Sequence, residues 1–143
     1  MNRPPLPVIA AIAIALLLGA CSAPAGLAAF QRDATAADQL PAGPDTPGTP
    51  KMENTRVLAE ADGVRYYAAQ TDSSAVTCLV KVPGDGTTGF VAGCGSSMVT
   101  GQIVTVSGAD GSAATLVTDG FDTKELEAAG WRKLQENVLI GRR

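Results

Sequence analysis

Hydrophobic and polar residues divide the chain into three stretches with different patterns. Residues 8–18 are eleven consecutive Ala, Ile, Leu and Val residues. Residues 22–50 follow no period and contain five of the nine prolines and eight alanines. From about Lys51, short runs alternate apolar with polar residues, which is typical of half-buried β-strands. The pattern predicts a β-rich domain over residues 51–143, preceded by two segments of different character.

The first apolar run has the properties of a secretory signal. It is shorter than the roughly 20 residues of a membrane-spanning helix, and one cation, Arg3, precedes it. At its end, Leu18-Gly19-Ala20-Cys21 resembles the lipobox of bacterial lipoproteins. The resemblance implies that residues 1–20 are a signal peptide and that an acylated, palmitate-type Cys21 anchors the protein on the extracytoplasmic face of the cell membrane. The alternatives are an uncleaved anchor and a plain secretory signal cleaved near Ala23 or Ala25.

The composition of residues 21–50 predicts a tether. A segment this rich in proline and alanine cannot bury enough apolar surface to offset its ordering entropy. Within it, Thr35 and Asp38 form a near capping box that Pro41 ends. One interpretation is a transient helical turn in a linker. The other is that Phe30 and Leu40 dock on the folded domain or on a partner near the membrane.

Two motifs carry a family resemblance. The first is Phe30-x-Arg32-x-x-Thr35-x-x-Asp38-x-Leu40-Pro41, and the second combines Cys78-Leu79-Val80 with Gly93-Cys94-Gly95. This combination is similar to predicted membrane-anchored proteins of unknown function from actinobacterial-type Gram-positive bacteria. The resemblance implies a membrane-attached protein, and it brings no activity with it.

Cys78 and Cys94 predict a disulfide. With Cys21 lipidated, they remain as an even pair in an exported domain. If their strands pair around the 83–89 loop, the two cysteines face each other, and the enclosed loop corresponds to about 3 kcal/mol of stabilisation. The same register places Val80 opposite Ala92 and Val82 opposite Phe90. Because the chain has no histidine, the two cysteines cannot complete a four-ligand zinc site.

Two further hairpins are predicted where an Asp-Gly pair, which favours a two-residue type I′ turn, separates alternating stretches. The turns are Asp62-Gly63, between residues 57–61 and 64–70, and Asp110-Gly111, between residues 102–107 and 113–118. The expected cross-strand pairs are Leu58 with Tyr67, Ala59 with Tyr66, Val104 with Val117, and Val106 with Thr115. Both faces of the later hairpin are partly apolar, which favours a curled sheet or small barrel.

One short α-helix is predicted near the C-terminus. Asp122 is its expected N-cap, Glu125 completes a capping box, and Gly130 ends it. We expect Leu126 to pack between Phe121 and Trp131, either as a helix that covers one side of the sheet or beside a ligand site lined by Trp131. A last strand carries Leu134, Val138 and Ile140, with a bulge at Asn137. The predicted fold is mainly β, an antiparallel sheet or barrel of about six or seven strands.

The chemistry of the chain favours binding over catalysis. The lack of histidine excludes Ser-His-Asp and Cys-His sites. Ser96-Ser97 lacks the flanks of a nucleophile elbow, and the glycine-rich loop at 84–89 lacks the lysine of a phosphate loop. A net charge of −3 without a basic patch argues against nucleic acid. We expect no catalytic residue, metal or cofactor.

The expected function is therefore a non-catalytic binding or envelope-associated module. Its partner would be an envelope protein or wall component that contacts Arg65 and Tyr67, which share the less apolar face of their strand. The alternative is a small histidine-free hydrolase of the cell envelope.

Overall fold

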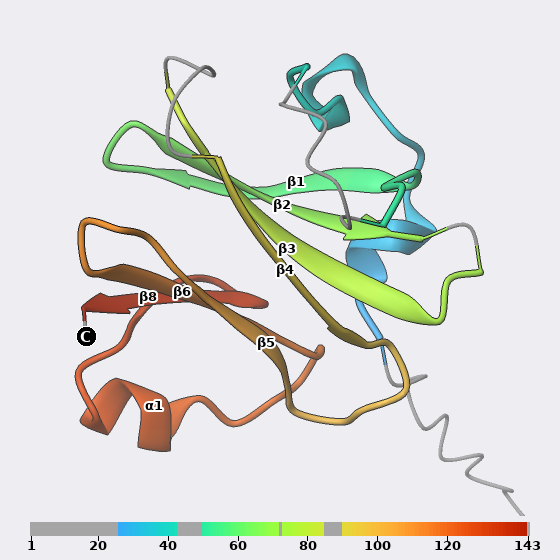
Figure 1. Ribbon diagram of the computed structural model, residues 1–143. Helices are drawn as coiled ribbons and strands as arrows, with labels where there is room; N and C mark the ends of the chain where they lie inside the picture. The colour runs from blue at the N-terminus through green and yellow to red at the C-terminus, as the bar shows by residue number, and fades with distance from the viewer. Residues whose placement is uncertain (1–25, 43–49, 72, 85–89, 143) are drawn as a thin grey trace, which may run out of the picture.

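The computed structural model describes residues 26–42, 50–71, 73–84 and 90–142. The apolar run at 8–18, Cys21 and most of the glycine-rich loop lie outside these ranges. The described chain forms eight antiparallel strands in two four-stranded sheets, with one short helix near the C-terminus (Figure 1). The predicted mainly β class is confirmed.

Each sheet follows the chain closely. The first has the order β1-β2-β3-β4, with strands β1 (Thr55–Ala61), β2 (Val64–Gln70), β3 (Val76–Pro83) and β4 (Val91–Ser96). The second has the order β5-β6-β8-β7, with strands β5 (Gln102–Ser107), β6 (Ser112–Val117), β7 (Arg132–Gln135) and β8 (Val138–Arg142). Because β4 lies against β5 and β1 against β7, the sheets meet at both edges as a flattened barrel (Figure 1).

The first hairpin turns as expected but contains a bulge. Asp62 and Gly63 have φ of 53° and 73°, as a type I′ turn requires. Ala59 lies opposite Tyr66, which confirms that pair. The expected pairing of Leu58 with Tyr67 is wrong, because a bulge at Leu58 brings Val57 opposite Tyr67.

The hairpin of β5 and β6 is one residue away from its expected register. Val104 pairs with Leu116 and Val106 with Ala114. The cause is a longer turn, in which the Gly108 N–H donates to the Ser112 carbonyl and Gly111 adopts a φ of 77°. Three-residue loops of this kind end on a left-handed glycine. The expected two-residue turn at Asp110-Gly111 is therefore wrong.

The C-terminal residues fold back once more than expected. The prediction of a single last strand is wrong, because Glu136 and Asn137 form a turn between β7 and β8. Asn137 is buried there, and its Nδ2 donates to the Val117 carbonyl and to Asp119. A bulge had been expected at Asn137, and this buried polar turn takes its place.

Helix α1 (Lys124–Ala128) lies beside the second sheet, and none of its residues is buried (Figure 1). Its N-cap is Thr123, not Asp122 as expected; the Asp122 carboxylate accepts a bond from the Lys124 N–H at 3.1 Å. Gly130 has a φ of 93°, as the expected left-handed stop requires. The Trp131 ring lies against β8, where an added Cβ on Gly141 would be 3.1 Å from it. Trp131 thus packs on the sheet, while the expected packing of Leu126 between Phe121 and Trp131 stays a prediction.

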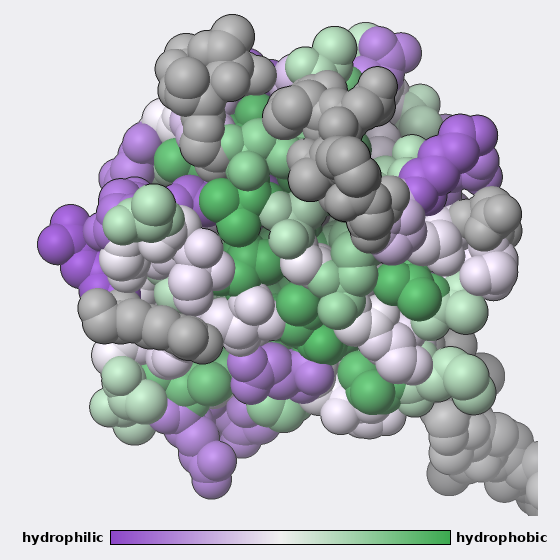
Figure 2. Space-filling view, viewed as in Figure 1, coloured by the Kyte–Doolittle hydropathy of each residue, from purple (hydrophilic) through white to green (hydrophobic). Residues whose placement is uncertain are grey.

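The first sheet is apolar on both faces. Its inner face packs on the second sheet through a cluster that includes Leu79, Leu116 and Val138. Its outer face carries a second cluster of Tyr67, Ala69, Cys78, Val80 and Val82. The partly buried side chains of Leu40 and Met52 pack over this outer cluster. Figure 2 shows apolar side chains across the middle of the molecular face that carries β4 and β5.

Residues 26–42, which the composition assigned to the tether, pack on the domain. They include two 3-10 turns, η1 (Ala28–Gln31) and η2 (Ala36–Asp38). Phe30 packs against the inner core, and Asp38 is 1% exposed. The docked interpretation of this motif is therefore the one found.

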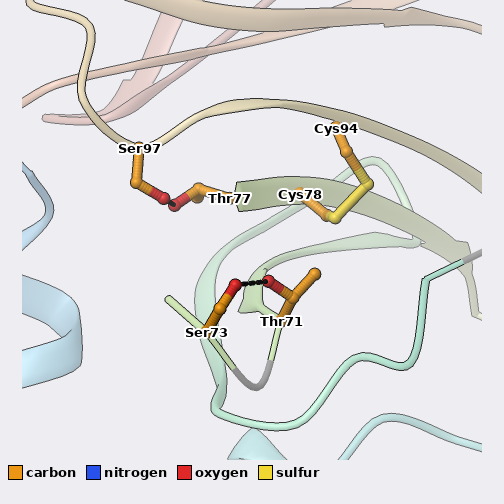
Figure 3. The surroundings of a disulfide bond; sticks show 6 residues. All are labelled: Thr71, Ser73, Thr77, Cys78, Cys94 and Ser97. Carbon is orange, nitrogen blue, oxygen red and sulfur yellow. Dashed lines mark hydrogen bonds between the residues drawn. A yellow bond between two sulfur atoms is a disulfide. The ribbon is translucent and has the colours of Figure 1, made fainter. Parts of the chain in front are cut away.

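The predicted disulfide forms between directly opposite residues of β3 and β4. Val80 faces Ala92, as expected; the pairing ends at Lys81 and Val91, and Phe90 packs on the same outer cluster as Val82. Figure 3 shows the Cys78–Cys94 bridge beside a hydrogen bond of 2.7 Å between the hydroxyls of Thr77 and Ser97.

The glycines on either side of Cys94 permit β5 to pack on β4. An ideal Cβ at Gly95 would be 2.2 Å from the Ile103 carbonyl oxygen, and one at Gly93 would be 2.7 Å from the Val106 side chain. Any side chain at either position would push β5 away. The Gly-Cys-Gly motif thus combines a crosslink on the outer face with close strand contact on the inner one.

Candidate functional site

A groove of about 590 Å³ opens at one end of the flattened barrel. Three turns surround it: the β1–β2 turn, the β5–β6 turn and the connection from α1 to β7 (Figure 1). Its polar lining consists of Asp62, Tyr66, Lys81, Asp110, Ser112, Arg132 and Arg142. We call it the inter-sheet groove, because both sheets contribute to its walls.

Lys81 is the buried cation of this groove. It comes from β3, is 6% exposed, and donates from Nζ to the Ser112 hydroxyl on β6. The Ser112 Oγ in turn donates to the Asp110 carboxylate at 2.6 Å, and Lys81 Nζ lies 3.8 Å from that carboxylate. The bonds from Ser112, with Lys81 adding a smaller attraction, lower the pKa of Asp110. A buried ammonium needs such partners, so this cluster also links the two sheets.

An ion pair bounds the other side of the groove. Arg132 on β7 donates to Asp62 in the β1–β2 turn at 2.8 Å. Both side chains are more than half exposed, so the pair contributes little stability and can open to a ligand. Behind it lies Tyr66, whose pKa is raised by burial and then by the nearby Asp62 carboxylate.

The groove has a local charge opposite to that of the protein. Three cations, Lys81, Arg132 and Arg142, line it together with two acids, Asp62 and Asp110. The local sum is 3 − 2 = +1, whereas the whole chain carries −3. In a partly enclosed site this difference favours acidic groups on a ligand.

The residues predicted to contact a partner are not together on the surface. Arg65 is exposed on β2 and forms an ion pair of 3.4 Å with Glu60. Tyr67 is fully buried in the outer cluster, and its hydroxyl has no hydrogen-bond partner within the part of the chain that the structure describes. Tyr67 therefore cannot contact a partner from this position. The face of β2 that the sequence indicated as less apolar is covered by other residues of the chain, among them Leu40 and Met52.

The two cysteines are paired as the sequence predicts, whereas the groove was not predicted. Cys78 and Cys94 are bridged, and Cys21 lies outside the described residues. Lys81 gave the one available signal, as a lone cation in an apolar strand between Val80 and Val82. Its partner Ser112 is 31 residues away, and only the folded sheets bring the two together.

Among the described residues, no group of three or more acidic, cysteine or histidine side chains is placed to hold a metal ion. Within the same ranges, no helix has the length and apolar character needed to cross a membrane. No protein-family model, curated protein or solved structure matches the chain.

Proposed function

We propose that this protein is a lipid-anchored, non-catalytic binding module of the cell envelope that presents the inter-sheet groove away from the membrane. The lipobox-like Leu18-Gly19-Ala20-Cys21 supports the anchor. The Cys78–Cys94 bridge supports an oxidising, extracytoplasmic location.

The observation that carries the proposal is the distance between the groove and Gly26, the first described residue after Cys21. Gly26 is five residues after Cys21, and its carbonyl accepts a bond from the Asp119 N–H just beyond the end of β6. Ser112, at the start of β6, lines the groove. The six residues of β6 therefore separate the two sites by about 20 Å. A lipid on Cys21 leaves the groove at the membrane-distal end.

The packing of residues 26–42 on the domain limits how far the domain can turn above the membrane. Had residues 21–50 been a free tether, the domain could turn in any direction above the membrane. With residues 26–42 packed on the domain, only five residues connect its surface to Cys21. The groove then faces envelope components, and its net positive charge favours an acidic group on an envelope protein or wall component.

Site-specific photo-crosslinking in intact cells tests this function. A photo-reactive residue in place of Ala129, which lines the groove, is expected to give one discrete crosslinked species. The matched control replaces Lys124, at the other end of the helix that Ala129 caps and outside the groove lining, and is expected to give none. Arg142→Glu should abolish the Ala129 species, whereas Arg65→Glu should leave it. Equal crosslinking from both positions would contradict a groove-specific ligand.

One observation favours a hydrolase as the second candidate: the hydrogen bond between Lys81 and Ser112 resembles the contact a serine nucleophile needs. A neutral lysine would have to accept the serine proton, but here the Ser112 hydroxyl accepts a hydrogen bond from Lys81 and donates its own to Asp110. Binding is therefore the better-supported role. Labelling of the protein by a fluorophosphonate probe, lost in Ser112→Ala, would favour the hydrolase instead.

A further inference from the structure

The end of the barrel opposite the groove carries an exposed apolar loop. Met98 is 85% exposed and Val99 is 37% exposed, and they are the large hydrophobic side chains on the surface of the described residues. Both lie in the connection from β4 to β5. Because the two residues are neighbours on one turn, they form a small apolar patch that is available for a contact.

This loop lies beside the point where the described chain begins. The Gly101 N–H donates to the Thr118 hydroxyl at 2.8 Å, and the Thr118 N–H donates to the Gly101 carbonyl at 2.8 Å. The next residue, Asp119, is bonded to Gly26 and to the Ala28 N–H. Figure 1 shows the blue start of the described chain at the same end of the barrel as the β4–β5 connection.

The length of chain up to Cys21 limits how far this end can lie from a lipid. Five residues span at most about 18 Å when fully extended. The acidic groups nearby, Asp119 and Glu136, accept hydrogen bonds from the chain itself, at the Ala28 and Gly120 N–H groups. Met98 and Val99 carry no charge themselves, so the contact that this loop offers to a bilayer is apolar.

We infer that Met98 and Val99 form a second membrane contact, in which the β4–β5 loop rests in the interface of the bilayer that holds the lipidated Cys21. This inference rests on the proposed anchor and adds a fixed orientation to it. Two apolar side chains bind a bilayer weakly by themselves. On a chain already anchored about 18 Å away, the effective concentration of the bilayer is high enough to keep them in contact.

The methionines provide the test. Met1 belongs to the expected signal peptide, so a protein processed at Cys21 retains Met52 and Met98. Met52 is half-buried over the outer cluster and serves as the internal reference. A water-soluble oxidant such as chloramine T converts methionine to its sulfoxide at a rate that follows exposure. The readout is the ratio of Met98 to Met52 oxidation, measured by peptide mass spectrometry.

The lipidated protein on phosphatidylglycerol vesicles is compared with the mature chain carrying Cys21→Ser in solution. In solution, Met98 is expected to react first; on vesicles, the ratio is expected to fall about tenfold and to stay low at high salt. An unchanged ratio on floating vesicles would overturn the loop contact while leaving the anchor intact. Equal slowing of both residues would also overturn it, because general shielding by the vesicle has that effect. A wild-type protein that does not float with the vesicles would refute the anchor itself.

Discussion

The guanidinium of Arg32 and the carboxylate of Asp38 form a bidentate ion pair, with N–O distances of 2.6 and 2.7 Å, on the outer edge of the barrel. The Asp38 carboxylate also accepts bonds from the N–H groups of Thr35 and Val57. Val57 belongs to β1, so this one carboxylate joins the N-terminal segment to the first sheet. The role of the Arg32-x-x-Thr35-x-x-Asp38 motif is therefore structural: it fixes the N-terminal segment on β1.

Replacing Asp38 should therefore loosen the docked segment and destabilise the domain. Asp38→Asn keeps the size of the side chain but removes the charge that pairs with Arg32 and accepts two backbone N–H bonds. The expected loss in the free energy of unfolding is about 2–3 kcal/mol. Urea denaturation measures it, with Asp33→Asn in the same segment as the matched control. Equal stability of the two variants would show that the pair does not hold the segment.

The same carboxylate predicts a dependence of stability on pH. Its bonds to Arg32 hold the pKa of Asp38 far below its ordinary value, with the Thr35 and Val57 N–H groups adding to the effect. A lowered folded-state pKa gives stability that is present above the unfolded-state value of about 3.9 and is lost as the pH falls below it. At pH 3 the wild type should have lost about 1 kcal/mol through this group, and Asp38→Asn should not lose this part. Denaturation curves at pH 7 and pH 3 decide this; an identical acid response of both chains would contradict it.

The sequence predicted those elements whose determinants are local. Asp62-Gly63 has both the residue type and the spacing of a type I′ turn, and the turn forms. The parity of alternating residues placed Cys78 opposite Cys94, because a one-residue slip would move every inward side chain outward. Gly130 ends its helix for an equally local reason.

The remaining features depend on contacts between distant residues. The bulge at Leu58 and the three-residue loop before Ser112 each change a register by one residue, and neither has a residue type that requires it. Tyr67 looked like a surface residue, because the pattern of one strand cannot show that Leu40 and Met52, from earlier in the chain, cover its face. The inter-sheet groove was missed for the same reason, since Lys81 and Ser112 come from different sheets.

The disulfide should provide a large part of the stability of this small domain. Cys78 and Cys94 close a loop across β3 and β4, and the double variant Cys78→Ala, Cys94→Ala is expected to lose about 3 kcal/mol. Thermal denaturation of the oxidised wild type and the double variant gives the difference. Thiol titration of the exported protein under denaturing, non-reducing conditions should find neither cysteine free, and two titratable thiols would contradict the bridge.

Gly95 should be intolerant of even a methyl group. Its missing Cβ leaves room for the Ile103 carbonyl, so Gly95→Ala must move β5 away from β4. The expected cost is about 1–3 kcal/mol. The matched control is Ser96→Ala, the next residue on the same strand, which is exposed. Equal unfolding midpoints for the two variants would show that the strands can separate freely at this point.

In the proposed arrangement, a lipid on Cys21 anchors the barrel by one end and leaves the inter-sheet groove at the other. Intact-mass analysis of the mature protein, purified from membranes of cells that process it, tests this most directly. We expect an amino-terminal cysteine that carries a diacylglyceryl group, and loss of membrane attachment in Cys21→Ala. A mature protein that begins after Cys21, or a Cys21→Ala variant that is processed and stays on the membrane as before, would contradict it.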